Sequence, residues 1–334
     1  MNTIRKNTGN ITLTKLFNLS KIMLAFVAYS IGGSSRIRFF PCTLSVETSS
    51  ACNLQCRACA LALGDIQRQQ QFFDLAVYRN IISEAKPYLL NVNLYFQGEP
   101  LLNEQIIDFV EIAKQHGIRT TISTNGSLLE YYAESLVSSG CSHIIVSIDG
   151  MNNETYSAYR KHGDLNQVCI GIDKLLSYKK GMKSKLPFLE SQFLVTKYNE
   201  HEIDSYLQWA KQKGFDRITL KSAQIYSPDE SDLIPLQSKY ARYYLNGNGE
   251  LTIKSKLNNS CFRVLSSMVI TSDGEVVPCC FDKDAVHSYG NVHKSNIRDI
   301  VNNSKVRKFR NLVFTQRRSI TICQNCSTGL QIKY

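Results

Sequence analysis

Three cysteines stand close together at Cys52, Cys56 and Cys59, separated by three residues and then by two. Three thiolates are one ligand short of a closed structural zinc site, which normally has four protein ligands. In a cubane cluster of four irons, they would bind three iron atoms and leave the fourth open to a non-protein ligand. An open coordination position is typical of a catalytic metal centre. The alternative is a zinc knuckle that takes its fourth ligand from a distant residue.

The stretch from Cys52 to Cys59 resembles the three-cysteine motif of the radical S-adenosylmethionine (SAM) superfamily. The resemblance implies a 4Fe–4S cluster on Cys52, Cys56 and Cys59, with SAM chelating the open iron. It also implies reductive cleavage of SAM to a 5′-deoxyadenosyl radical that removes a hydrogen atom from a substrate, which is chemistry that the cofactor supplies. The residue before the third cysteine is often aromatic in the superfamily, and here it is Ala58.

Short polar elements after the later predicted strands extend the resemblance. Gly98-Glu99-Pro100 resembles the superfamily element whose carboxylate receives the methionine amine of SAM, and Ser123–Gly126 and Ser147–Gly150 resemble strand ends that meet its ribose and methionine parts. Asn-Gly and Asp-Gly also form turns readily, so a simple turn cap remains open for Asn125. The resemblance implies SAM contacts at Gly98, Glu99, Pro100, Ser123, Asn125, Ser147, Asp149, Arg160 and Leu194.

Two of these contacts depend on position in the superfamily pattern. Related enzymes often place an arginine where Arg160 stands, and a guanidinium suits the SAM carboxylate. An ordinary surface ion pair is the alternative for Arg160. The backbone at Leu194 is expected to meet the adenine.

A second group of cysteines lies in the C-terminal third of the chain. Cys261, Cys279 (five residues after Gly274) and the pair Cys323 and Cys326 resemble the SPASM extension of the superfamily, or its shorter form, twitch. The resemblance implies one auxiliary 4Fe–4S cluster held by Cys261, Cys279, Cys323 and Cys326. A fully ligated cluster favours electron transfer. The alternatives are a zinc site with four cysteine ligands, and Cys280 in place of Cys279.

The number and grouping of the cysteines also bear on the compartment. There are eleven, an odd number, and most are grouped at two places, unlike the disulfide framework of a small secreted protein. We therefore expect a reducing, cytoplasmic environment. Cys42, Cys141 and Cys169 are isolated and are predicted to be packed thiols.

Six predicted β–α repeats must position these residues. The predicted strands are Thr43–Thr48, Val92–Phe96, Ile118–Ser123, His143–Ile148, Phe188–Thr196 and Arg217–Lys221, with helical segments between them. Six units are too few for a closed eight-fold barrel, so we predict an α/β fold, a partial (β/α)6 TIM-like barrel. The chemistry of such folds collects at the C-terminal ends of the strands, where the SAM-site motifs fall.

The pattern changes after about residue 225. Residues 226–260 are polar and loop-like, a hairpin is predicted over 267–277, and a basic helix over 297–312. These elements would form a small cysteine-rich hairpin-plus-helix extension. We therefore divide the chain into an N-terminal amphipathic and basic segment (1–42), the partial barrel (43–225) and the auxiliary-cluster domain (226–334).

The net charge of +11 is concentrated in residues 1–50 and 294–318. These two basic segments are either solvated faces or a surface that contacts an acidic peptide or a membrane. No nucleic-acid-binding signature accompanies them, so we expect no nucleic-acid partner. Residues 13–31 have helical spacing, but their densest apolar run is too short to span a bilayer. This helix is predicted either to pack on the main domain or to touch a membrane peripherally; a signal peptide is less attractive because no clear cleavage site follows.

SPASM-bearing relatives mostly modify peptides or proteins, whereas twitch-bearing relatives include dehydrogenases of small molecules. The resemblance predicts a radical SAM enzyme that modifies a peptide or protein, with a donor such as flavodoxin or ferredoxin. The alternatives are a dehydrogenase of a small molecule or sugar-like cell-envelope substrate, and a non-catalytic binding protein stabilised by zinc or a cluster. No catalytic side chain is identified, although Tyr198, Asp282 and Asp284 lie in regions that could face a cavity.

Overall fold

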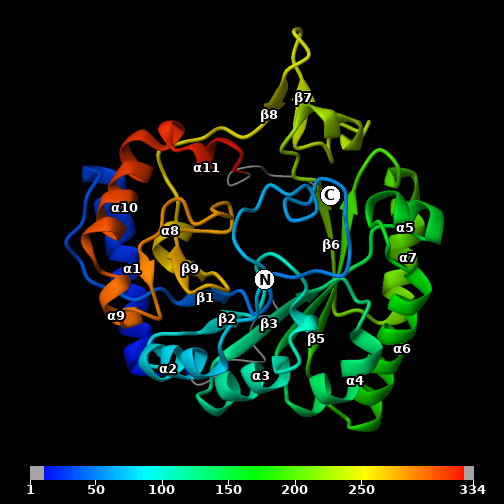
Figure 1. The fold of residues 1–334 in the computed structure, drawn as a ribbon, viewed down its shortest axis with the longest axis horizontal. Helices are drawn as coiled ribbons and strands as arrows, with labels where there is room; N and C mark the ends of the chain where they lie inside the picture. Colours follow the sequence, from blue (N-terminus) through cyan, green and yellow to red (C-terminus); the bar gives the residue numbers. More distant parts are fainter. Residues whose placement is uncertain (1–10, 327–334) are drawn as a thin grey trace. The chain divides into compact units, whose positions relative to one another are not determined.

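A computed structural model describes residues 11–326 of the chain (Figure 1). These residues form two compact units, each built from segments that are distant in the sequence. Within the described range, the first unit comprises residues 11–50, 68–121 and 257–324. The second comprises residues 51–67, 122–256 and 325–326.

The predicted alternation of strands and helices is confirmed. The β–α repeats are β1 (Thr43–Val46), α2 (Leu75–Ala85), β2 (Asn91–Asn93), α3 (Ile106–Gln115), β3 (Arg119–Thr124), α4 (Leu129–Ser138), β4 (His143–Ser147), α5 (Asn153–Tyr159), α6 (Leu165–Gly181), β5 (Phe188–Val195), α7 (Ile203–Lys213) and β6 (Arg217–Ser222). Short 3-10 helices are η2 (Pro100–Leu102), η3 (Glu200–Glu202), η4 (Pro228–Leu233) and η5 (Arg317–Ser319).

The first unit joins the start of the repeats to the C-terminal extension in one sheet. Its strands run in the order β11-β10-β9-β1-β2, followed by residues 119–121 at the start of β3, with β9 (Ser267–Ile270), β10 (Glu275–Val277) and β11 (Gly290–Asn291). The predicted hairpin is confirmed as the antiparallel pair β9–β10. Strand β9 also pairs in parallel with β1, and Leu44 is opposite Met268. Both side chains are fully buried, so this pairing lies in the core of the unit.

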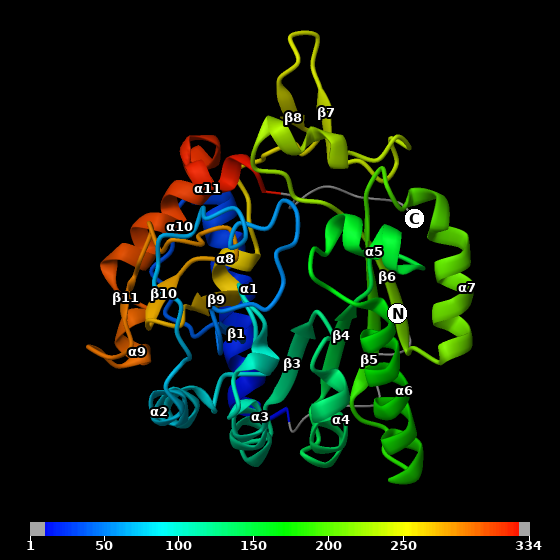
Figure 2. The same ribbon diagram turned by 45° about the vertical axis from the view of Figure 1, so that its right-hand side comes forward.

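The second unit contains the parallel strands β4, β5 and β6, in that order. Helices α4, α6 and α7 lie along one side of these strands (Figure 2). Residues that alternate along the strands, among them Ile144 and Leu189, are fully buried. The expectation of loop over 226–260 is wrong in part, because β7 (Tyr243–Leu245) and β8 (Leu251–Ile253) form an antiparallel hairpin. Its turn, Asn246-Gly247-Asn248-Gly249, is a strong hairpin signal that the sequence reading overlooked.

The predicted basic helix over 297–312 is also wrong in its bounds. It is broken into α9 (Ile297–Ile300) and α10 (Ser304–Gln316), because the Asn303 side chain accepts a hydrogen bond from the Val306 backbone N–H (3.0 Å) and caps a new helix. The N-terminal helix α1 (Leu13–Gly32) packs beside α10, where Phe314 contacts the rings of Phe26 and Tyr29. The remaining short helices are α8 (Arg263–Ser266) and α11 (Thr321–Gln324).

A buried ion pair holds the strand ends of the first unit together. Glu47 follows β1 and is fully buried; its two carboxylate oxygens accept hydrogen bonds from Arg68 at 2.7 and 3.0 Å. The same carboxylate accepts from the backbone N–H of Ser272 (2.8 Å), in the β9–β10 turn. Arg68 in turn donates to Asp273 (3.3 Å) and to the Lys283 carbonyl (2.6 Å). The pair therefore ties β1 to the extension.

We predict that Glu47→Gln lowers the free energy of unfolding by about 3 kcal/mol, because it leaves the buried Arg68 guanidinium with the partly exposed Asp273 as its remaining carboxylate partner. Anaerobic thermal unfolding would measure the change. The control is Glu111→Gln, which neutralises an exposed glutamate on α3. Equal melting curves for the two variants would contradict this role for Glu47.

Candidate functional site

The three-cysteine loop belongs to the second unit, and the end of α5 with the residues that follow it holds the loop in place. The Gln55 backbone N–H donates to the Lys161 carbonyl (3.2 Å), and the Arg57 N–H donates to the Tyr159 carbonyl (2.9 Å). Cys52, Cys56 and Cys59 are each half-buried. The loop is thus fixed by its backbone, which leaves its thiols to face other partners.

Asn125, after β3, clamps the first cysteine. Its side-chain NH2 group donates to the Cys52 sulfur (3.9 Å) and to the side-chain oxygen Oδ1 of Asn53 (2.9 Å), and the Asn53 side chain donates to the Ser127 hydroxyl (2.8 Å). The Asn125 oxygen also accepts from the Ser127 backbone N–H (2.9 Å). Asn125 therefore caps its turn and contacts the cysteine loop at the same time. Gly126 permits this turn for two reasons. Its φ of +84° is a conformation that favours glycine, and a side chain at this position would collide with a methyl group of Val168.

A buried carboxylate positions a cation at the second cysteine. Asp149, fully buried after β4, accepts from Arg160 Nε (2.6 Å) and from the Leu194 backbone N–H (2.6 Å). Arg160 Nη1 lies 3.8 Å from the Cys56 sulfur. Asn199 donates to the carbonyls of both Asp149 and Leu194 at 2.9 Å. The structure thus joins Asp149, Arg160 and Leu194, and brings Arg160 to Cys56.

Burial and the charge of Arg160 act in opposite directions on the pKa of the Cys56 thiol. Burial raises the pKa of the Cys56 thiol to about 11, Arg160 opposes the rise, and Cys59 and Cys52 add to it. Burial acts to lower the pKa of Arg160, but the charges of Asp149 and Cys56 outweigh burial and hold it well above its usual value. Metal binding displaces thiol protons, so a cluster would convert Cys56 to the thiolate that Arg160 can stabilise.

The remaining residues expected to contact SAM are spread over both units. In the second unit, Ser123 is half-buried in β3 and Ser147 is buried at the end of β4. In the first unit, Gly98 has a φ of +63° and Pro100 begins η2. The buried Glu99 carboxylate accepts from the Leu101 N–H (3.1 Å) and so caps this turn.

Sequence reasoning missed a group of residues that anchors the loop from the β6–β7 segment. Arg57 donates to Glu230 (3.2 Å) and Asp232 (2.7 Å), and Tyr198 donates to the same aspartate. Beside it, Ala58 is buried in an apolar cluster with Ala223, Ile225, Leu233 and Tyr243. These partners lie more than a hundred residues from the loop and follow no recognisable spacing. The small Ala58, at the position that is often aromatic, thus packs against the β6–β8 segment.

The C-terminal cysteines divide between the units. Cys261 and Cys279 are half-buried and Cys323 is buried in the first unit, while Cys326 is buried in the second. Cys280 is exposed, and Arg263 donates to its sulfur (3.3 Å). All eleven cysteines are thiols. Among residues 11–326, no three His, Cys, Asp or Glu side chains lie close enough to hold a single metal ion.

Two buried polar groups near these cysteines have unfilled hydrogen-bonding capacity. Burial raises the pKa of the Tyr289 hydroxyl well above its usual value, and Cys279 and Cys323 raise it further, which places both near this group. Within the described chain, neither the Tyr289 hydroxyl nor Arg310 Nη2 has a hydrogen-bond partner. Arg310 is buried with its guanidinium 4.4 Å from the Phe39 ring centre, and it donates to the Val264 carbonyl. A donor and a cation that lack an acceptor suit an anionic group here.

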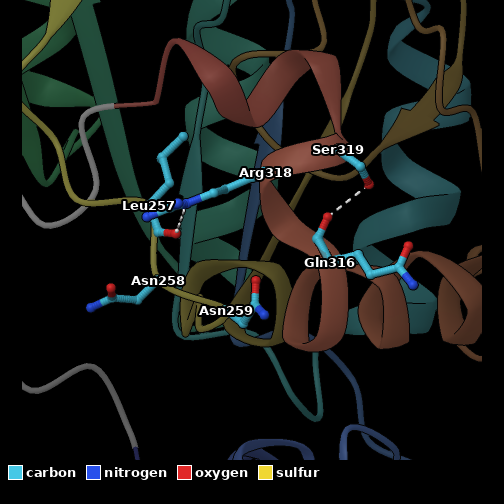
Figure 3. A pocket seen from close by; sticks show the side chains of 6 residues that line it. All are labelled: Leu257, Asn258, Asn259, Gln316, Arg318 and Ser319. Carbon is cyan, nitrogen blue, oxygen red and sulfur yellow. Dashed lines mark hydrogen bonds between the residues drawn. The ribbon is translucent and has the colours of Figure 1, made fainter.

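A polar pocket of about 560 Å³ lies on the segments that lead to Cys261 and Cys323 (Figure 3). Asn259 joins the two segments, since it donates to the Thr315 carbonyl (2.6 Å) and accepts from the Arg317 N–H (3.0 Å). The pocket is lined by Leu257, Asn258, Asn259, Gln316, Arg318 and Ser319.

The residues that sequence reasoning placed near a cavity have structural partners. The Asp282 carboxylate is buried and accepts from the backbone N–H groups of Val286 and His287, both at 2.9 Å. Tyr198 donates to Asp232. Both side chains are therefore engaged in hydrogen bonds within the fold. Of the isolated cysteines, Cys141 is buried, and Cys42 and Cys169 are half-buried.

Comparison with known proteins agrees with this geometry. A sequence profile of the radical SAM superfamily matches residues 46–219, and one of the SPASM iron–sulfur cluster-binding domain matches residues 261–327. This chain belongs to the radical SAM superfamily. The membership confirms the expected cofactors of this radical SAM enzyme, 4Fe–4S clusters and SAM.

A relative found by sequence, and solved structures with a similar fold, match this chain at low sequence identity. GTP 3′,8-cyclase of Alkaliphilus oremlandii is 25% identical over 284 residues, which cover 78% of this chain and 84% of that protein. Streptococcus suis SuiB bound to the precursor peptide SuiA superposes with a TM-score of 0.61 at 17% identity, over 95% of this chain and 76% of SuiB. The structure of BtrN in complex with AdoMet and 2-DOIA superposes with a TM-score of 0.54 at 20% sequence identity, over 86% of this chain and 93% of BtrN. The radical SAM chain thus has the predicted fold, a partial TIM-like barrel with a C-terminal extension.

We predict that Arg160→Gln in this radical SAM enzyme weakens SAM binding about 10- to 100-fold, because it removes the guanidinium that Asp149 holds beside Cys56. Equilibrium binding of SAM to the anaerobic protein with its clusters would measure the loss. Lys161→Gln, which removes the adjacent exposed cation, is the matched control. An unchanged SAM affinity in Arg160→Gln would reduce Arg160 to a structural ion pair.

Proposed function

We propose that this radical SAM enzyme modifies a peptide or protein substrate and that its auxiliary 4Fe–4S cluster accepts an electron from the substrate radical. When bound, the first cluster and SAM supply the 5′-deoxyadenosyl radical that removes a hydrogen atom from the substrate. The observation that carries the proposal is the convergence of Asn125 on Cys52 and of Arg160 on Cys56. These contacts, from the end of β3 and the end of α5 to a three-thiol loop, support a cofactor site of the expected kind.

The residue roles at the first cluster follow from their chemistry. Cys52, Cys56 and Cys59 would hold the irons, and Arg160, fixed by Asp149, would pair with the SAM carboxylate. The Leu194 backbone, which Asp149 and Asn199 fix, would meet the adenine. The other proposed SAM contacts are the Gly98-Glu99-Pro100 turn at the methionine amine and Ser123, Asn125 and Ser147 around the ribose and methionine parts.

The auxiliary cluster would be held by Cys261, Cys279, Cys323 and Cys326. The contact of Arg263 with the exposed Cys280 supports Cys279 as the ligand. Buried Tyr289 and Arg310 support an anionic cluster rather than an apolar core, since a cluster held by thiolates would supply the acceptor and the negative charge that they lack.

A peptide or protein substrate is supported by the peptide-bound SuiB structure, whose fold this chain shares. The β7–β8 hairpin adds a physical reason. In the described chain, these two strands pair only with each other, so an extended peptide has a strand edge on which it can align.

A small-molecule substrate is the second candidate. It is supported by BtrN, which was solved with AdoMet and 2-DOIA and of which this chain covers 93%, and by the GTP 3′,8-cyclase relative. A flavodoxin or ferredoxin donor and a cytoplasmic location remain predictions.

Iron analysis after anaerobic reconstitution tests both cluster sites. We predict about eight irons for the wild type, and about four for either the Cys52/Cys56/Cys59→Ala variant or Cys279→Ala. Cys280→Ala is the matched control and should keep all eight. With dithionite and SAM, Cys279→Ala should still produce 5′-deoxyadenosine, whereas the triple variant should produce none.

Each departure from this pattern has a definite meaning. Zinc in place of iron at the second site would remove the electron acceptor. The absence of both iron at the first site and 5′-deoxyadenosine would favour a non-catalytic binding protein.

The substrate class can be tested without knowing the substrate. We predict that the high-molecular-weight fraction of a host-cell extract stimulates formation of 5′-deoxyadenosine above the uncoupled rate, and that protease treatment of the fraction abolishes the stimulation. Chromatographic quantification of 5′-deoxyadenosine provides the measurement, and the triple cysteine variant is the control. Stimulation by the low-molecular-weight fraction alone, insensitive to protease, would favour the small-molecule alternative.

A further inference from the structure

Helix α1 has two apolar faces, although a surface helix normally has one. One face is buried in the first unit, where Ile22, Ala25 and Tyr29 pack and Phe314 of α10 stacks on Tyr29. Asn18 fixes this face, because its amide group donates to the Phe40 carbonyl (2.8 Å) and accepts from the Phe40 N–H (2.9 Å). The helix is therefore docked in one defined orientation.

The opposite face of α1 exposes large aliphatic and aromatic side chains. Leu13 is 85% exposed, Phe17 63%, Leu24 60% and Ile31 84%. Because these residues recur mostly at three- and four-residue intervals, they form one stripe along the helix. The whole exposed set, which we call the α1 stripe, is Leu13, Leu16, Phe17, Met23, Leu24, Val27 and Ile31. An apolar stripe on the outer side of a docked helix is not needed for the core of the unit.

The charges around the α1 stripe are positive. Helix α1 contains no acidic residue, and Glu47 is the first acidic residue of the chain. Helix α10, which packs beside α1 (Figures 1 and 2), exposes Lys305, Arg307 and Lys308 and has no acidic residue. Lys21 of α1 borders the stripe, because its Nζ lies 4.5 Å from the centre of the Phe17 ring. An apolar stripe with basic neighbours is complementary to a surface that is apolar beneath a layer of negative charge.

We propose that the α1 stripe is a docking surface for an anionic membrane, with the helix lying in the interface and the basic side chains of α10 near the lipid headgroups. No helix within residues 11–326 is long and apolar enough to cross a bilayer. A lipid surface fits this stripe better than a protein groove does, because the side chains of the stripe are large and apolar and offer few directional hydrogen bonds. Ser20 is the polar side chain within the stripe, and its hydroxyl donates to the Phe17 carbonyl of its own helix. Association would therefore combine apolar burial with salt-sensitive attraction.

Vesicle sedimentation of the full-length protein tests the proposal. The wild type should bind phosphatidylglycerol-containing vesicles at least about tenfold more tightly than phosphatidylcholine vesicles, and high salt should weaken the binding. Leu24→Asp should weaken the binding at least about tenfold, because it places a carboxylate in the stripe. Lys305→Glu/Lys308→Glu should remove most of the preference for the anionic lipid.

The matched control is Val286→Asp, which adds the same charge at an exposed apolar side chain of the first unit outside α1 and should leave binding unchanged. Iron content and melting temperature equal to those of the wild type would show that the variants fold. Binding unaffected by Leu24→Asp, or none to anionic vesicles, would overturn the proposal. A dimer in light scattering that Leu24→Asp dissociates, without vesicle binding, would identify a second copy of the chain as the occupant instead.

Discussion

The candidate SAM site depends on one carboxylate that has no access to water. Asp149 is fully buried, and its oxygens are committed to Arg160 Nε and to the Leu194 N–H. A buried charge is tolerated only when it is paired and hydrogen-bonded, so β4, β5 and the end of α5 must meet in this arrangement. The cation beside Cys56 is therefore placed by the fold, in advance of any cofactor. Asn199, which holds the carbonyls of Asp149 and Leu194, reinforces the same arrangement.

The same electrostatic principle acts with opposite sign in the C-terminal extension. There the fold buries a guanidinium and a phenol, Arg310 and Tyr289, and leaves hydrogen-bonding groups of both unmatched within the described chain. The first unit contains another buried cation, Arg68, which is neutralised by Glu47. The two buried cations differ in this respect. Arg68 has a carboxylate from the protein itself, whereas Arg310 has none among residues 11–326, which is consistent with an acceptor at Arg310 that the cofactor supplies.

The sequence predicted those parts of the fold and site that depend on short spacing. The β–α repeats appear in hydrophobic runs, and the two cysteine groups and the polar strand ends appear as compact motifs. What it could not predict depends on contacts between distant residues. The parallel pairing of β1 with β9 joins segments more than two hundred residues apart, and both strands carry ordinary apolar patterns. The partners of Arg57 also lie far away, among acidic residues that could equally face solvent. The break between α9 and α10 follows from a single cap at Asn303, which a periodicity argument overlooks.

The pairing of β9 with β1 has a consequence for the modularity of the protein. The auxiliary-cluster segment resembles an appendage in the linear sequence, yet its strand β9 pairs with β1, the strand that precedes the first cysteine loop. A chain that ended before β9 would leave β1 as a bare edge with unsatisfied backbone groups and an uncovered apolar face, a template for self-association. A lineage that lost this extension would have to acquire another cap for the same edge. Removal of the auxiliary-cluster segment would therefore also break the backbone hydrogen bonds between β9 and β1 and expose a strand edge.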